Sequence, residues 1–268
     1  MEEAAPAWVL DELPLWSAPF GLALLETVVL APGLTVLDVG FGTGFPLLEL
    51  AARLGPGAIA LGVDPWVEGA RHARAKAMAC GLEYVQVLQA EAEHLPLASE
   101  RFDLVVSNNG FNNVRDLRGA LAETRRVCRK GAQLVLTLNL PDTMALFYDG
   151  LAEVLRESGL ESSLPALAAH IRARRPPLPD VRASLEAAGF ALRGETRGAF
   201  SLRFLDGRTL FAHPLIRRGF LEAWKAVPPA DRVGDVFALL ERRLDEMAAA
   251  RGELRLEIPF VCIDGRAG

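Results

Sequence analysis

One stretch of this sequence, residues 36–50, restricts the possible folds more than any other. It begins with apolar residues, continues through Gly40, Gly42 and Gly44, and ends in a segment that reads as the start of a helix. Glycine has no Cβ, so it accepts positive φ values and lets a backbone approach a ligand closely. The first N–H groups of a helix have no partner within it and favour polar or anionic groups. The pattern therefore predicts a strand, a tight turn and a helix that bind a nucleoside-like ligand.

Strands and helices alternate through the first half of the chain. The predicted strands lie at about 35–40, 58–63, 84–89, 101–107 and 132–139, with helices between them at about 45–54, 66–80 and 115–129. This alternation is typical of βαβ units with a mostly parallel sheet and right-handed crossovers. Residues 58–63 are almost wholly apolar, as expected of a strand that helices cover on both faces. We therefore expect an α/β fold.

The regular alternation loosens after Asn139. The pattern predicts a helical segment at about 142–175, a helix at about 178–188, a strand at about 190–197, a hairpin across Asp206-Gly207, helices at about 214–226 and 230–250, and a strand at 254–262. We predict a core with an N-terminal helical segment over 1–140, a helical cap over 141–177, and the rest of the core over 178–268 with a second insert at about 198–250.

Composition and charge disfavour several classes of function. The net charge is −5 and no long basic run occurs, which argues against a nucleic-acid partner. No uninterrupted apolar run reaches the roughly 18 residues of a membrane span. The cysteines Cys80, Cys128 and Cys262 are far apart and lack zinc-site spacing, so we expect free thiols, no metal and a cytoplasmic location. The acidic N-terminus is unlike a signal peptide.

The spacing of the glycines indicates which nucleoside the turn binds. A dinucleotide site uses G-x-G-x-x-G, whereas the glycines here follow G-x-G-x-G and Phe45 stands where that pattern needs a small residue. Asp38 precedes the turn, where a carboxylate close to a pyrophosphate would be unfavourable. S-adenosylmethionine carries an ammonium and a sulfonium, so it suits a nearby acid better.

Two further acids extend the predicted site, each with an alternative role. Asp64 ends the second strand about 20 residues beyond the turn, where a carboxylate accepts hydrogen bonds from ribose hydroxyls. It is equally suited to cap a helix that starts near Pro65. Glu91 follows the third strand and is placed to accept from an adenine amino group, or to be a solvated loop acid.

Four motifs occur in a fixed order over about residues 34–140. They are residues 36–44, 61–64, 91–106 and 123–131. In this order they resemble the class I S-adenosylmethionine-dependent methyltransferases, close to the ubiquinone and menaquinone biosynthesis type called methyltransferase type 11. The sequence departs from that pattern at Lys130-Gly131-Ala132, where the family has Pro-Gly-Gly, and at Glu91, where it usually has Asp.

The resemblance implies a Rossmann-like fold, with a mostly parallel seven-stranded sheet, helices on both faces and helical inserts that form a cap. It implies S-adenosylmethionine as cofactor, with the glycines along the methionine part, Asp64 at the ribose and Asn108 on the sulfonium side. The cofactor-binding residues that it implies are Asp38, Gly40, Gly42, Gly44, Asp64, Pro65, Trp66, Glu91, Ala92 and Asn108.

The methyl acceptor is less constrained. Residues 108–113 carry four asparagines, which either fix a polar acceptor or form a turn and helix cap. We name Trp16, Asn109, Asn112 and His213 as candidate acceptor contacts, although Trp16 is equally suited to packing and a lone histidine is usually structural. His94, His170 and Tyr148 are the other candidate bases. Arg172, Arg174 and Arg175 either meet an anionic acceptor or form a solvated helix end.

The function that these features favour is in-line methyl transfer from S-adenosylmethionine to a small-molecule acceptor, without nucleic-acid or membrane partners. Such a reaction depends mainly on alignment of the reactants, and a base is needed only if the acceptor must lose a proton. The alternatives are a nicotinamide-dependent oxidoreductase and a protein that binds S-adenosylmethionine without catalysis. The acceptor atom, the pathway and the oligomeric state do not follow from these residues.

Overall fold

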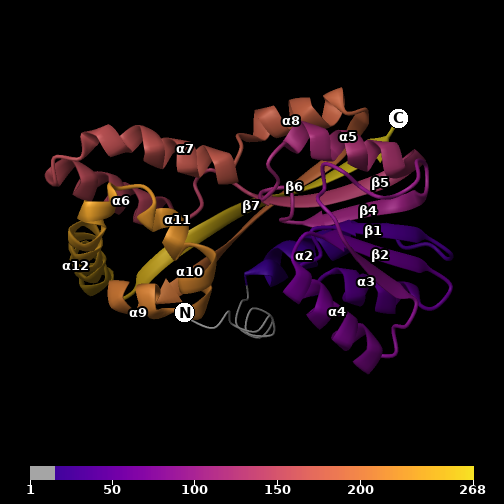
Figure 1. The fold of residues 1–268 in the computed structure, drawn as a ribbon, viewed down its shortest axis with the longest axis horizontal. Helices are drawn as coiled ribbons and strands as arrows, with labels where there is room; N and C mark the ends of the chain where they lie inside the picture. The colour runs from indigo at the N-terminus through magenta and orange to yellow at the C-terminus, as the bar shows by residue number, and fades with distance from the viewer. Residues whose placement is uncertain (1–15) are drawn as a thin grey trace. The chain divides into compact units, whose positions relative to one another are not determined.

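The computed structural model describes residues 16–268 (Figure 1). The described residues form two compact units. The first takes in the described part of Met1–Leu138 together with Pro177–Arg197 and Phe260–Gly268. The second consists of Asn139–Pro176 and Gly198–Pro259. The chain therefore enters the second unit twice, and each unit is described by itself below.

A seven-stranded sheet runs through residues 16–268 in the order β3-β2-β1-β4-β5-β7-β6. Its strands are β1 (Thr35–Val39), β2 (Ile59–Asp64), β3 (Val85–Gln89), β4 (Phe102–Asn108), β5 (Cys128–Asn139), β6 (Phe190–Phe204) and β7 (Leu254–Ala267). The pairs β1–β2, β1–β4, β2–β3 and β4–β5 are parallel. The predicted Rossmann-like, mostly parallel seven-stranded sheet is thus confirmed, and the strand order reverses at β1, where a ligand crevice is expected.

Both faces of the sheet are buried in the first unit. Its helices are α2 (Ser17–Thr27), α3 (Leu47–Leu54), α4 (Val67–Ala79), α5 (Leu117–Val127) and α8 (Leu178–Ala187). On one face, Val36 of β1 packs in a cluster with Leu24 of α2 and Leu50 of α3. On the other face, Leu37 of β1 and Val105 of β4, which are register partners, are both 0% exposed. Apolar residues at successive strand positions explain this two-sided burial.

The second unit is mainly helical. Its helices are α6 (Ala145–Glu157), η1 (Glu161–Ser163), α7 (Leu164–Arg174), α9 (Gly207–Ala212), α10 (Pro214–Gly219), α11 (Leu221–Lys225), η2 (Ala230–Arg232) and α12 (Val233–Arg251). Phe147 of α6 stacks on Trp224 of α11, with ring centroids 3.9 Å apart. Leu240 and Leu244 of α12 are fully buried as well. This unit has an aromatic and aliphatic core of its own.

The predicted hairpin across Asp206-Gly207 is wrong. β6 runs without a turn to Phe204, and Asp206 is the N-cap of α9 instead. The Asp206 carboxylate accepts from the backbone N–H of Thr209, and the Thr209 hydroxyl accepts from that of Asp206. This reciprocal capping box starts a helix where a local Asp-Gly signal suggested a turn.

Other boundaries differ for local reasons. The helical segment predicted at 142–175 is split after α6, where Gly159 has a φ of +67° and Pro165 lies in the first turn of α7. The helix predicted at 214–226 is likewise two helices, α10 and α11. β5 starts four residues earlier than the predicted 132, and β7 continues five residues beyond the predicted 262.

Candidate functional site

A cavity of about 420 Å³ lies in the first unit at the carboxyl ends of the central strands. Three of its lining residues, Val39, Asp64 and Asn108, are the last residues of β1, β2 and β4. The cavity therefore lies at the point where the strand order reverses. Ligands of open α/β sheets collect at this point. The cavity is lined by Trp16, Ser17, Val39, Gly40, Gly42, Val63, Asp64, Pro65, Trp66, Ala90, Glu91, Ala92, Glu93, Asn108, Asn109, Gly110, Asn113 and Val114.

The glycine turn borders the cavity, and each of its glycines has a different constraint. Gly40 has a φ of +84°, and a Cβ on it would lie 2.9 Å from the Cα of Gly110. Gly42 has a φ of +56°, and a Cβ there would meet no atom within 4 Å. Gly44 does not line the cavity, and a Cβ there would lie 2.8 Å from Leu48 of α3. The first two glycines therefore shape the cavity, and the third allows close helix packing.

Asp64 is held rigidly at the cavity wall. Its Oδ2 accepts a hydrogen bond from the backbone N–H of Gly42 at 2.9 Å, and its Oδ1 accepts from that of Trp66 at 2.8 Å. Burial raises the pKa of Asp64, and these two backbone hydrogen bonds oppose that rise. The predicted alternative of a helix N-cap is wrong, because α4 starts at Val67 with Trp66 as its N-cap. Each oxygen keeps one lone pair that can accept from a ligand hydroxyl.

Asp38 is buried and does not line the cavity. It is 0% exposed, and neither carboxylate oxygen makes a hydrogen bond of standard geometry with the described residues. Burial, and then the negative charge of Asp64, raise its pKa to about 8, although the backbone N–H of Leu47 acts in the opposite direction. A buried carboxyl without a partner of opposite charge stays protonated near neutral pH. A cation bound nearby would therefore stabilise the ionised form of Asp38.

The ends of β2 and β3 form a second wall. Pro65 and Trp66 line it from one side, and Glu91 and Ala92 line it from the other. Ala92 is buried and Glu91 is exposed. In α4, a Cβ on Gly69 would lie 2.7 Å from the carbonyl oxygen of Gly42, so this glycine lets the helix approach the turn. The sequence places an apolar surface and an acceptor carboxylate on this wall.

The asparagines at the end of β4 and in the turn after it differ in whether they line the cavity. Asn108 lines the cavity, donates from Nδ2 to the carbonyl oxygen of Ser17 and accepts at Oδ1 from the Thr137 hydroxyl. Asn109 also lines it, and its φ of +60° is left-handed. Asn112 is 4% exposed and is not part of the described lining. Part of the predicted polar cluster therefore faces the cavity, and part supports the turn.

The remaining acceptor candidates lie in different units. Trp16 lines the cavity and makes an edge-to-face contact with Phe20, with centroids 5.6 Å apart, so it both packs and borders the site. His213 belongs to the second unit, between α9 and α10. Its Nδ1 is buried without a partner among residues 16–268, and burial lowers its pKa. Its role as an acceptor contact stays a prediction.

The structure adds a contact that the sequence did not reveal. Gly110 packs against the turn: a Cβ on it would lie 2.5 Å from the carbonyl oxygen of Val39. The Ser107 hydroxyl also donates to that oxygen at 2.7 Å. Gly110 directly follows two asparagines in the sequence, but its contact Val39 lies on β1, which is far away in the chain. Asn113, one of the four asparagines in the predicted polar cluster, also lines the cavity, and so does Val114, which was not predicted.

The fourth motif supports a loop and does not touch the cavity. Glu123 of α5 accepts from the backbone N–H of Leu95. Arg126 donates to the carbonyl oxygens of Leu95 and Leu97 and pairs with Glu123 at 2.7 Å. These contacts fix the loop that follows Glu91 and Ala92, so the motif positions one wall of the cavity from behind.

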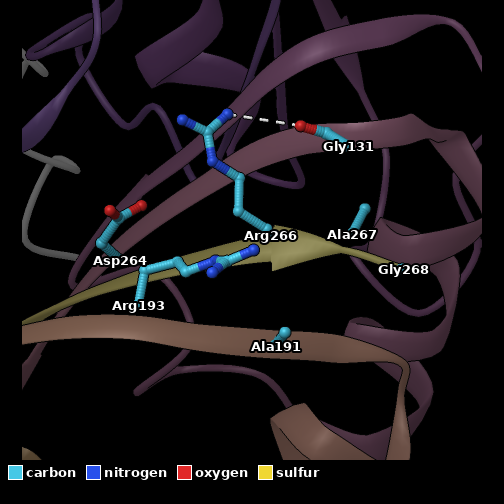
Figure 2. Close-up of a pocket in the computed structure, with 7 residues that line it drawn as sticks. All are labelled: Gly131, Ala191, Arg193, Asp264, Arg266, Ala267 and Gly268. Carbon is cyan, nitrogen blue, oxygen red and sulfur yellow. Dashed lines mark hydrogen bonds between the residues drawn. The ribbon is translucent and has the colours of Figure 1, made fainter.

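A second hollow of about 530 Å³ lies at the end of β7, also in the first unit (Figure 2). Arg266 in it donates to the carbonyl oxygen of Gly131, and Asp264 accepts from Gln133. It shares no lining residue with the cavity at the strand ends. Its Arg266 and Asp264 bond to neighbouring protein groups, whereas the cavity beside Asp64 lies where the strand order reverses, so that cavity is the candidate site.

Comparison with known proteins identifies the family. A family model described as a methyltransferase domain matches residues 37–136. The demethylmenaquinone methyltransferase of Thermus thermophilus is 42% identical over 101 residues, which is 38% of this chain and 45% of that protein. Residues 37–136 of this chain therefore form a methyltransferase domain. The predicted resemblance to methyltransferase type 11 is thereby confirmed.

The match to one relative extends beyond this domain. The nocamycin O-methyltransferase of Saccharothrix syringae is 28% identical over 256 residues, which is 92% of this chain and 90% of that protein. The other curated relatives compared are matched over 37–49% of their own length. The YcgJ protein of Bacillus subtilis has the same fold, with a TM-score of 0.60 at 19% identity over 93% of this chain and 98% of that one.

Between residues 16 and 268, no helix is both long and apolar enough to cross a membrane. In the same residues, no group of three or more His, Cys, Asp or Glu side chains is arranged to hold a metal ion.

Proposed function

We propose that this methyltransferase binds S-adenosylmethionine in the cavity beside Asp64 and transfers its methyl group to a small-molecule acceptor. The observation that carries the proposal is the fixed Asp64 carboxylate, held by the N–H groups of Gly42 and Trp66. One lone pair of each oxygen accepts from a ribose hydroxyl, and the backbone hydrogen bonds keep the carboxylate aligned without further ordering cost. A vicinal diol is the partner that this arrangement suits.

The two ends of the cofactor suit the two ends of the cavity. Adenine is flat and apolar on its faces, so it fits beside Pro65 and Trp66, with its amino group donating to Glu91. The methionine part fits along Gly40 and Gly42, where a Cβ is missing. Its ammonium supplies the positive charge that stabilises the ionised form of the buried Asp38. Asp38 does not line the cavity, so we assign it an electrostatic role and no direct contact with the cofactor.

Methyl transfer requires little from the protein beyond alignment of the methyl donor and the acceptor. S-adenosylmethionine is already activated, so the acceptor atom attacks the methyl carbon as the bond to sulfur breaks and S-adenosylhomocysteine leaves. Holding acceptor and donor in line and without water can supply roughly 7–11 kcal/mol of the barrier. The proposal assigns Asn108 and Asn109, at the end of β4, to the wall nearest the transferred methyl group.

A small molecule is proposed as acceptor because the relative that matches most of both chains is named a nocamycin O-methyltransferase. A hydroxyl or enol oxygen is therefore the first acceptor class to test. The absence of a long basic run makes nucleic acid a poor candidate. All three cysteines are free, as in proteins of the reducing cytoplasm, where we propose that this enzyme works.

Calorimetric titration with S-adenosylmethionine and with NAD tests the cofactor. We expect S-adenosylmethionine to bind and NAD not to bind at the same concentrations. Tight binding of NAD alone would favour the oxidoreductase and contradict the proposal. Release of S-adenosylhomocysteine in the presence of hydroxylated small molecules then separates an enzyme from a protein that only binds the cofactor.

A further inference from the structure

Three arginines near the end of α7 differ sharply in their surroundings. Arg172 and Arg174 are exposed, as a solvated helix end requires. Arg175, the next residue, is 2% exposed. A guanidinium cannot escape burial by losing its proton, because its pKa lies above the physiological range. The buried positive charge of Arg175 therefore needs an anionic or hydrogen-bonding partner, from the protein or from a ligand.

The protein supplies only part of that partner. Arg175 donates from Nη1 to the Tyr148 hydroxyl at 3.0 Å, and its guanidinium carbon lies 5.0 Å from the centre of the Tyr148 ring. Among residues 16–268, no carboxylate pairs with it. Its Nε is buried without a hydrogen-bond partner in the described residues, and its Nη2 has none there either. A positive charge is thus buried without a negative one.

The free donors lie on one edge of the guanidinium. The N–H of Nε and one N–H of Nη2 are parallel, and together they form the fork that accepts both oxygens of a carboxylate or phosphate. Because Nη1 donates to the Tyr148 hydroxyl, that oxygen fixes the plane of the guanidinium, and the donors on the Nε and Nη2 edge have no partner in the described residues. The unsatisfied atoms therefore match an anion with two coplanar oxygens.

The surroundings of Tyr148 make the fork rigid. Its hydroxyl also accepts from Nε1 of Trp224 at 3.0 Å, so both of its lone pairs are used by donors. Its own proton is then directed to Nε2 of His170, 3.3 Å away, which places the histidine proton on Nδ1. Phe147 stacks on Trp224 and meets Tyr148 edge-on. These residues come from α6, α7 and α11, which Figure 1 shows within the second unit.

We propose that the Nε and Nη2 edge of Arg175 binds an anionic group, a carboxylate or a phosphate, of a small-molecule ligand. This assignment does not depend on the proposed function. The site itself is a preorganised anion fork within the second unit, and it would exist whether or not methyl transfer occurs.

Binding of simple anions, without S-adenosylmethionine, tests the fork. Benzoate supplies a carboxylate, phenyl phosphate supplies a phosphate, and benzamide is a neutral match for benzoate. At constant ionic strength we expect one or both anions to raise the melting temperature of the wild-type protein with increasing concentration, and benzamide not to do so. The anion that acts identifies the source of the charge.

Variants separate a binding role from a structural one. Arg175→Met should abolish the response, and Arg175→Lys, which keeps the charge but not the fork, should weaken anion binding at least about tenfold. Tyr148→Phe should weaken it through loss of the anchor. Arg174→Met removes an exposed neighbouring charge and should respond like the wild type. Without ligand, Arg175→Met should melt at the wild-type temperature or higher, because an unpaired buried charge is removed.

Three outcomes would overturn the proposal. The first is no response of the wild type to either anion. The second is an equal response of wild type and Arg175→Met. The third is a lowered melting temperature of Arg175→Met with anion binding retained by Arg175→Lys at wild-type affinity. If anions bind but no S-adenosylhomocysteine is ever released, the anion site stands and the proposed function falls.

Discussion

The backbone N–H of Gly42 donates to the Asp64 carboxylate at 2.9 Å, and this bond joins the glycine turn to the end of β2. Asp64 thereby holds the glycine turn in place and also lines the cavity. The other Asp64 oxygen is held by Trp66, so the carboxylate faces the cavity with its backbone side already satisfied. The orientation of the proposed ribose acceptor is a property of the protein without ligand.

Replacing Asp64 tests this relationship. Asp64→Ala should weaken S-adenosylmethionine binding by about 1–3 kcal/mol, because charge-assisted hydrogen bonds to the ribose are lost. Titration calorimetry measures the change. Glu68→Gln removes an exposed carboxylate four residues away that does not line the cavity, and it should bind like the wild type. Equal affinity of the Asp64 variant and the wild type would remove Asp64 from the site.

The contact between Gly40 and Gly110 gives a prediction for stability. Gly40→Ala should lower the free energy of unfolding by about 1–3 kcal/mol, since the position has a φ of +84° and the new Cβ would lie 2.9 Å from a backbone atom. Gly57→Ala is the control, because its φ is not in the left-handed region and its Cβ would meet nothing within 4 Å. Urea unfolding of both variants gives the comparison, and similar losses would contradict it.

The buried Asp38 predicts a dependence of stability on pH. The folded protein holds this proton up to about pH 8, whereas the unfolded chain releases it near the ordinary value of 3.8. The folded state thus binds the extra proton between these values, so the Asp38 contribution is largest at low pH and falls as pH rises through the window. Asp38→Asn has no such proton.

Thermal unfolding of the wild type and Asp38→Asn, from about pH 5 to about pH 8, measures this effect. Relative to the variant, the wild type should lose as much as about 4 kcal/mol, at about 1.4 kcal/mol for each pH unit. Titrations of other groups are common to both proteins and cancel in the difference. A difference that stays constant with pH would show that Asp38 is ionised in the folded protein.

The pair of Glu123 and Arg126 predicts a structural effect of a family motif. Arg126→Ala should lower the free energy of unfolding by about 1–3 kcal/mol, because the carbonyl oxygens of Leu95 and Leu97 lose their donor. Arg53→Ala breaks an exposed pair with Glu49 and should lower it by no more than about 0.5 kcal/mol. Denaturant unfolding compares the two, and an equal loss would show that the loop does not depend on Arg126.

The parts of the site that local sequence determines were predictable. Gly40, Gly42 and Asp64 follow a strand, a turn and a strand end, and each can be placed from its neighbours in the chain. Gly110 could not be assigned, because its contact with Val39 requires β4 to lie beside β1. Arg175 has the sequence context of an exposed helix end, but it is buried in the folded chain and contacts Tyr148 of α6, a residue far away in the sequence.

The error at Asp206-Gly207 has the same origin. An Asp-Gly pair favours a hairpin turn when its neighbours form two strands. Here Thr209 completes a capping box, and the backbone N–H of Gly207 donates to Asp245 of α12 at 2.8 Å. The first contact is local and detectable in the sequence. The second is between residues far apart in the chain, and together they convert the turn signal into a helix start.

The most direct test of the account is transfer of a labelled methyl group. The protein would be incubated with methyl-labelled S-adenosylmethionine and a panel of hydroxylated small molecules, half of them carrying a carboxylate or phosphate, and products would be read by mass spectrometry. We expect a labelled product together with S-adenosylhomocysteine, and less of both when Asp64 is replaced by Ala at limiting cofactor. Bound S-adenosylmethionine with no labelled product from any acceptor would contradict it.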